Sequence, residues 1–124
     1  MDEEMTRAEF VLQESEIPEG GRKVVKINGV DVGIFKVGGE FHAVLNWCPH
    51  EGGPVCKGYI TGTVLWDEST GSKPGWVKEG EILCCPWHGY EFDLTSGKCI
   101  TREELRLRRY KVSRALDGKI TIEM

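Results

Sequence analysis

Cys48-Pro49-His50 and Cys85-Pro86-Trp87-His88-Gly89 are the two segments on which the fold of this chain depends. Each offers one thiol and one imidazole, and two Cys with two His are enough to hold a metal centre. Cys-x-His places both side chains on one side of an extended or looped backbone, and Cys-x-x-His fits a tight turn, so both segments are expected in loops. Zinc sites more often pair like ligands, whereas each of these loops mixes a Cys with a His. The pattern therefore points away from zinc.

With the residues that follow them, these segments resemble the two cluster-binding loops of Rieske 2Fe–2S proteins, as Cys48-Pro49-His50-Glu51-Gly52 and Cys85-Pro86-Trp87-His88-Gly89-Tyr90-Glu91-Phe92-Asp93. A weaker resemblance covers residues 19–46 and 110–122. The resemblance implies that Cys48 and Cys85 bind one iron of a 2Fe–2S cluster, while His50 and His88 bind the other. Two neutral imidazoles in place of two thiolates make the oxidised cluster neutral, so it accepts an electron more readily than a four-Cys cluster does.

Length and composition limit the class of protein. The chain has 124 residues, 16 of them glycine, which suits one loop-rich domain over residues 9–124 after a flexible N-terminus at 1–8. A net charge of −4 argues against nucleic-acid binding. The first residues lack the basic and apolar regions of a signal peptide, and the sequence has no run of about 18 apolar residues. We therefore expect a cytoplasmic protein that does not contact a membrane.

Turn signals divide the chain into short strands and predict an all-β fold. Asn28-Gly29, Gly38-Gly39, Ser96-Gly97 and Asp117-Gly118 separate apolar or alternating runs. The apolar residues Leu105 and Leu107, then Tyr110 and Val112, slip by one in the period of two, which predicts a bulge near Arg108-Arg109. The resemblance adds a sandwich of antiparallel sheets with a small cluster-binding subdomain. The expected strands are 22–27, 30–37, 40–46, 91–94, 98–101, 105–113 and 119–123.

The segment between the two loops departs from the family. Thirty-four residues separate His50 from Cys85, about twice the family's usual spacing, and the excess is an inserted hairpin-like segment at about 61–80. It carries Trp66, Pro74, Trp76 and a turn-like run at 69–72. One interpretation is a solvated hairpin that packs its own tryptophans. The other is an arm beside the cluster that docks a partner protein.

The remaining cysteines and the third histidine are expected to be structural. Cys84 precedes Cys85 and should face the opposite way, as a small buried residue. Cys56 and Cys99 are also expected in the core. Respiratory-chain relatives resemble this chain with Cys at the positions of Gly53 and Trp87, so their inter-loop disulfide cannot form here.

His42 is expected to be an ordinary strand residue, and the basic run Arg106, Arg108, Arg109 and Lys111 a solvated face or a docking patch for an acidic partner. The respiratory relatives also place a Ser where Tyr90 stands and a Tyr where Phe92 stands, hydroxyls that raise the potential. Their absence predicts a low-potential centre, near the bottom of the range of about −150 to +300 mV.

The resemblance implies an electron-transfer protein with no catalytic site of its own. A soluble Rieske ferredoxin would carry single electrons from an NAD(P)H-dependent flavoprotein reductase to a terminal oxygenase. Once His50 and His88 are assigned to the cluster, His42 alone remains for a mononuclear iron site that needs two His and a carboxylate. Two alternatives stay open: the small subunit of a nitrite-reductase-like complex, and a structural zinc module using the same four ligands.

Overall fold

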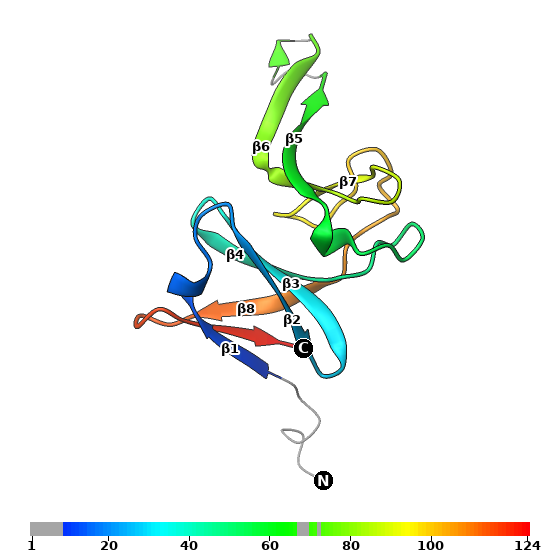
Figure 1. Ribbon diagram of the computed structural model, residues 1–124. Coiled ribbons are helices and arrows are strands. Elements are labelled where there is room, and N and C mark those ends of the chain that lie inside the picture. The colour runs from blue at the N-terminus through cyan, green and yellow to red at the C-terminus, as the bar shows by residue number, and fades with distance from the viewer. Residues whose placement is uncertain (1–8, 67–69, 72) are drawn as a thin grey trace.

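A computed structural model describes residues 9–66, 70–71 and 73–124 (Figure 1). The expected flexible segment at 1–8 lies outside the described residues, as do Ser69 and Ser72 of the expected turn. The regular secondary structure of the described chain is almost wholly antiparallel strand, so the all-β prediction is confirmed. Two short 3₁₀ turns, η2 (Glu14–Glu16) and η3 (Val55–Lys57), interrupt the strands.

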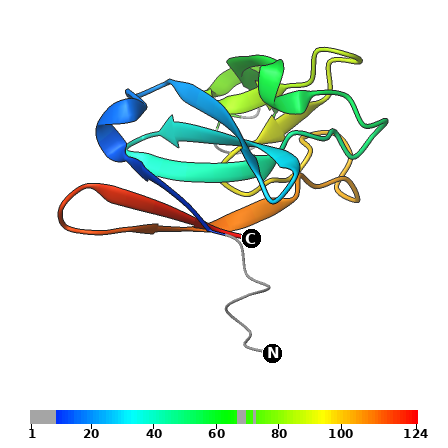
Figure 2. The same ribbon diagram turned by 60° about the horizontal axis from the view of Figure 1, so that its bottom comes forward.

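The larger sheet has six strands in the order β1-β9-β8-β4-β3-β2. Figure 2 shows that this base sheet folds over on itself, so that β3 and β4 lie in one layer and β1, β8 and β9 in the other. The smaller sheet has the order β5-β6-β7 and carries the long hairpin that projects from the molecule in Figure 1. The strands are β1 (Glu9–Gln13), β2 (Arg22–Ile27), β3 (Val30–Val37), β4 (Glu40–Leu45), β5 (Tyr59–Leu65), β6 (Gly75–Cys84), β7 (Glu91–Asp93), β8 (Arg109–Arg114) and β9 (Lys119–Glu123).

Two hydrophobic cores meet on opposite faces of β3 and β4. Ile34 and Ala43 belong to the core inside the folded base sheet, whereas Phe35 and Val44 belong to the core under the two loops. Because neighbouring residues of a strand point to opposite faces, both faces of these strands are buried. The base sheet therefore supports the loop region directly. The loop-side core also contains Cys48, Val55, Cys56, Leu83, Cys85, Phe92, Leu94, Cys99 and Leu107.

The hairpin between β2 and β3 forms where the sequence indicated. Asn28 and Gly29 both have positive φ, at 52° and 83°, which the type I′ turn requires. Register pairs Ile27 with Val30 across this turn.

The strand predicted at 105–113 is wrong in its first half. β8 begins at Arg109, and its pairing with β4 and β9 shows no bulge. Leu107 is buried in the loop-side core, whereas Tyr110 packs against the base core. The slip in periodicity therefore marks the passage of the chain from one core to the other. The strand predicted at 98–101 is reduced to the isolated bridges Phe92↔Cys99 and Lys98↔Arg106.

Close contacts join the base sheet to the loop region. Arg22 of β2 donates hydrogen bonds to the carbonyls of Cys56, at 2.8 Å, and of Gly58. A Cβ on Gly33 would lie 2.4 Å from the Cys56 sulfur, so Cys56 occupies the space that this glycine leaves open. A Cβ on Gly58 would lie 1.7 Å from the carbonyl oxygen of Cys84. The segment after the first loop thus packs directly on the strand that leads into the second.

Candidate metal centre

The two ligand loops share one backbone design although their spacings differ. In the first, Cys48 donates its N–H to Gly53 at 2.8 Å, and its carbonyl accepts from Gly52 at 2.7 Å. In the second, Cys85 donates to Tyr90 at 2.8 Å, and its carbonyl accepts from Gly89 at 3.0 Å.

Gly52 and Gly89 close these turns at φ values of 79° and 73°, in the left-handed region that suits glycine. The glycine that trails each ligand pair is therefore required by the backbone of the loop. Backbone hydrogen bonds within each loop therefore close it around its own cysteine.

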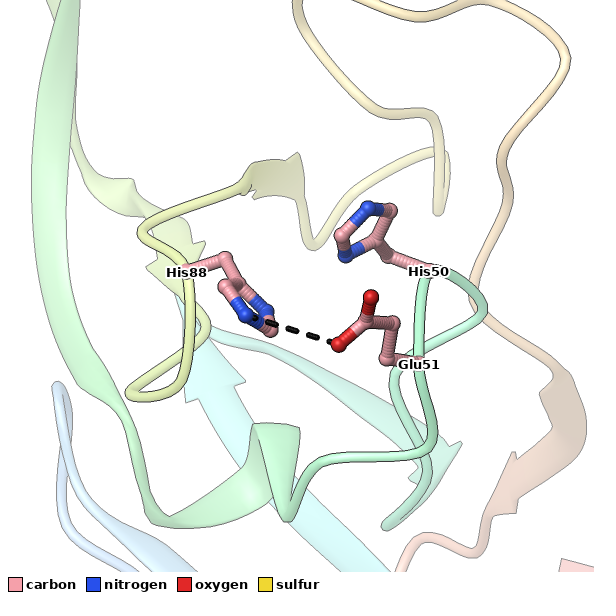
Figure 3. A group of neighbouring side chains, drawn as sticks. All are labelled: His50, Glu51 and His88. Carbon is pink, nitrogen blue, oxygen red and sulfur yellow. Dashed lines mark ion pairs between the residues drawn. The ribbon is translucent and has the colours of Figure 1, made fainter.

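The folded chain brings the four predicted ligand residues together. The rings of His50 and His88 have centroids 5.0 Å apart and lie nearly edge to face, at 82°. Figure 3 shows the two imidazoles projecting from different loops into the same space. Cys48 and Cys85 are 2% and 1% exposed, and their thiols interact electrostatically with each other. The thiols form the buried floor of the site, and the imidazoles lie nearer the surface.

The residues present fit a cluster held by two thiolates and two imidazoles. Nδ1 of His50 is buried and has no hydrogen-bond partner within the described part of the chain. A buried polar atom without a partner is costly, and a metal ion would satisfy it. Burial also raises the pKa of the Cys48 thiol, so a buried thiolate at this position calls for a cation beside it.

Two tryptophans cover the first loop. A Cβ on Gly53 would lie 2.8 Å from the indole of Trp87, and one on Gly52 would lie 2.7 Å from the indole nitrogen of Trp47. Trp87 therefore packs on Gly53. These are the two positions at which the sequence excludes the inter-loop disulfide of the respiratory-chain relatives. All five cysteines lie in the described part and are free. Contact between Trp87 and Gly53 joins the two loops without a covalent bond.

Aromatic residues of the second loop surround His50. The centroid of the Tyr90 ring lies 4.2 Å from that of the His50 ring, and the Tyr90 side chain interacts electrostatically with Arg102. Phe92 is fully buried in the loop-side core. The Tyr90 ring thus packs on His50, and Phe92 offers no hydroxyl.

The other cysteines fall into two groups. Cys56 and Cys99 are buried, as expected, and burial raises the pKa of Cys56 to about 12. Cys84 is only half-buried, so the prediction of a buried residue is wrong. It faces away from the core because it neighbours Leu83 and Cys85 in an extended chain, and both of those are buried.

His42 and the basic run lie away from the ligand loops, on β4, on β8 and in the segment before it. Nδ1 of His42 lies 3.0 Å from an Arg109 guanidinium nitrogen. Burial and this cation lower the pKa of His42, which favours the neutral ring. Arg108 lies over the Tyr110 ring, and Lys111 pairs with Glu123. Both His42 and this part of the basic run thus have local partners within the sheet.

Sequence reasoning missed the part that Glu51 plays in the site. His50, Glu51 and His88 form a group of potential ligands whose atoms lie within 4.8 Å of one another. Figure 3 shows the carboxylate of Glu51 turned toward His88, and Oε2 lies 3.4 Å from Nε2. The available signal was its position directly after His50, but the partner lies on the other loop.

None of the helices in the described residues is long and apolar enough to cross a membrane.

One relative is the ferredoxin component of the naphthalene 1,2-dioxygenase/salicylate 5-hydroxylase systems of Ralstonia sp. It is 29% identical over 85 residues, covering 68% of this chain and 64% of the relative. The chain therefore matches slightly less than two thirds of that relative's length.

Two solved structures share the fold. The first is described as the small subunit of an NADH-dependent nitrite reductase from Mycobacterium tuberculosis, with a TM-score of 0.68, 19% identity, and 95% and 96% of the two chains covered. The second is the ferredoxin of carbazole 1,9a-dioxygenase from Nocardioides aromaticivorans, with a TM-score of 0.64, 18% identity, and 90% and 92% covered.

Residues 8–111 match the family described as the Rieske [2Fe-2S] domain. This family binds a 2Fe–2S cluster through two Cys and two His, the same donor set that the two loops bring together. The match covers most of the sequence, including both ligand loops and the strands that support them. The chain therefore belongs to the Rieske 2Fe–2S domain family.

Proposed function

We propose that the chain is a single-electron carrier whose cluster is held by Cys48 and Cys85 on one iron and by His50 and His88 on the other. The observation that carries this proposal is the pairing of two buried thiols with two imidazoles at the mouth of one site, one of each from either loop. When bound, the cluster supplies reversible one-electron chemistry. The family match favours this centre over a structural zinc site.

The residues of the chain would bury one side of the site and leave the other open. Cys48 and Cys85 lie against the loop-side core, and the indoles of Trp47 and Trp87 cover the first loop. The His88 side chain is 45% exposed, so a partner can approach the imidazole edge closely. This asymmetry suits a carrier, because one face excludes water while the other admits a redox partner.

The donor we propose is an NAD(P)H-dependent flavoprotein reductase, and the acceptor a terminal oxygenase. The relative from Ralstonia, a ferredoxin component of dioxygenase and hydroxylase systems, supports the oxygenase as acceptor. The chain would have no catalytic site of its own. It has three histidines, and with two assigned to the cluster, His42 alone remains for a mononuclear iron site.

The small subunit of a nitrite-reductase-like enzyme is the second candidate. The structure from Mycobacterium tuberculosis supports it, because nearly the whole of both chains is covered. The two functions differ in assembly. A ferredoxin is purified alone and reduces its oxygenase in trans, whereas a subunit co-purifies with its large partner in fixed ratio. Affinity purification from the native host, followed by mass analysis, separates them.

Ligation is tested by electron paramagnetic resonance of the dithionite-reduced protein, together with iron and sulfide analysis. The wild-type chain is expected to give a Rieske-type signal. His50→Ala or His88→Ala should abolish or convert that signal, and Cys85→Ser should lose the cluster. The matched control is Cys84→Ser, which should keep the cluster because the half-buried Cys84 faces away from the site. An iron-free wild-type protein, or bleaching by Cys84→Ser but not by Cys85→Ser, would refute the assignment.

The hairpin of β5 and β6 supports a second contact with the partner. Val64 and Trp76 pair across its strands and are each 58% exposed. Trp76 lies over Gly62 and donates to Glu79 at 2.8 Å, so its indole is oriented although it faces solvent. Oriented, exposed aromatics often anchor interfaces. We propose that this hairpin docks the electron acceptor.

The docking role of the hairpin of β5 and β6 is tested by measuring the concentration of ferredoxin that half-saturates the acceptor. Trp76→Ala or deletion of residues 67–78 should raise it several-fold and leave the reduction potential unchanged. Val11→Ser, an exposed apolar position on β1, is the control and should change neither. Unchanged half-saturation for both arm variants would contradict the docking role.

A further inference from the structure

The two imidazoles of the site have different surroundings. Nδ1 of His50 is buried, and the ring packs against Tyr90. Nε2 of His88 instead lies 3.4 Å from Oε2 of Glu51, and both side chains are substantially exposed, at 45% and 56%. Glu51 belongs to the first loop and His88 to the second, so this contact spans the site (Figure 3). Both imidazoles have a nitrogen within 4.8 Å of the carboxylate, and among the described ion pairs Glu51 is paired with His88.

A histidine that binds a metal through one nitrogen usually donates the N–H of the other to a carboxylate, a carbonyl or water. Such a partner fixes the tautomer and the ring orientation, and it makes the imidazole a stronger electron donor. The carboxylate of Glu51, 3.4 Å from Nε2 of His88, is the candidate for such a partner. In the described ion pairs, the partner of Glu51 is His88. No neighbouring cation in those pairs offsets its charge.

We propose that Glu51 is a positioning residue that accepts a hydrogen bond from Nε2–H of His88 and lowers the reduction potential of the centre. The hydrogen bond leaves Nδ1 of His88 for iron. The negative charge opposes reduction, because reduction adds an electron beside a carboxylate. The inference rests on the proposed ligation of the cluster by His88. It adds a residue that tunes the potential from outside the ligand set.

The size of the effect follows from the distance and the exposure. A unit charge several ångströms from the centre, largely screened by water, changes the equilibrium constant for reduction by about three- to tenfold. A tenfold change corresponds to about 59 mV for a one-electron couple. Because the pair is exposed, salt should reduce the effect of the charge.

The experiment measures the midpoint potential of the intact, cluster-loaded protein by a redox titration followed in the visible spectrum. Glu51→Gln removes the charge and keeps the size of the side chain, and it should raise the equilibrium constant for reduction about three- to tenfold. Glu51→Asp keeps the charge and should stay closer to the wild type. Repeating the titration in concentrated salt should narrow the gap between wild type and Glu51→Gln.

Glu14→Gln is the matched control. Glu14 forms an exposed ion pair with Arg114 at 3.0 Å, and the substitution removes the same negative charge. Glu14 lies on η2, which is far from the two loops in both ribbon views (Figures 1 and 2). Spin quantitation of the reduced proteins verifies equal cluster loading. A Glu51→Gln potential equal to that of Glu14→Gln, or lower than wild type, would overturn the inference. Absence of a Rieske signal in the wild type would instead refute the proposed function.

Discussion

Gly58→Ala should damage the metal centre without touching a ligand. The backbone at Gly58 has φ −74° and ψ −177°, which any residue can adopt, so the substitution introduces no conformational strain. The added Cβ would lie 1.7 Å from the carbonyl oxygen of Cys84. Since that oxygen belongs to the backbone, it cannot rotate away. Relief requires the segment leading to Cys85 to move.

The cost can be estimated from the contacts that must change. Non-bonded atoms need about 3.5 Å between centres, so β5 and β6 would have to separate by well over 1 Å at this point. Overpacking of this kind costs about 1–3 kcal/mol. Arg22 also donates to the Gly58 carbonyl, and losing that bond adds about 1 kcal/mol. We expect a loss of about 2–4 kcal/mol in the free energy of unfolding.

Two measurements check this prediction. Iron and sulfide per chain should fall in Gly58→Ala, and the denaturant midpoint, followed by tryptophan fluorescence, should decrease. Gly75→Ala is the matched control on the same hairpin, because its Cβ would approach the Thr70 side chain at 3.0 Å and no backbone atom closer than 3.9 Å. Wild-type loading and an unchanged midpoint in Gly58→Ala would refute the reasoning.

Three further outcomes are expected. The midpoint potential should lie near the bottom of the range of about −150 to +300 mV, because Phe92 offers no hydroxyl; a value above the middle of that range would contradict this. Arg22→Lys should lower the free energy of unfolding by about 2 kcal/mol, since a lysine cannot reproduce the guanidinium bonds to two carbonyls; denaturant titration checks this, and an unchanged midpoint would be inconsistent with it. Burial raises the pKa of Asp93, but hydrogen bonds from Thr95 and Lys78 outweigh burial and hold this pKa below its ordinary value. The folded state therefore binds fewer protons than the unfolded state, and Asp93 contributes stability above pH of about 3.9 that is lost as the pH falls through its folded pKa. Asp93→Asn should lower stability at neutral pH and flatten the acid limb of a curve of unfolding midpoint against pH, and an acid limb identical to that of the wild type would count against this role.

The sequence determined those features whose physical cause is local. A Cys and a His separated by one or two residues, each followed by a glycine, predicted two loops, and the structure forms them with matching hydrogen bonds around Cys48 and Cys85. Asn28-Gly29 predicted a hairpin because both residues tolerate positive φ, and both adopt it. Strand alternation predicted the all-β class.

Tertiary structure decided the features that depend on residues far apart in the chain. The slip in the two-residue spacing of apolar residues before Tyr110 predicted a bulge. It arises instead because Leu107 and Tyr110 face two different cores. Cys84 is half-buried because only the folded sheet defines which face of β6 is covered. The contact between Glu51 and His88 crosses 36 intervening residues and exists only once both loops are in place. Local spacing named the candidate ligands, and packing between the two loops set the electrostatic environment that each of them has.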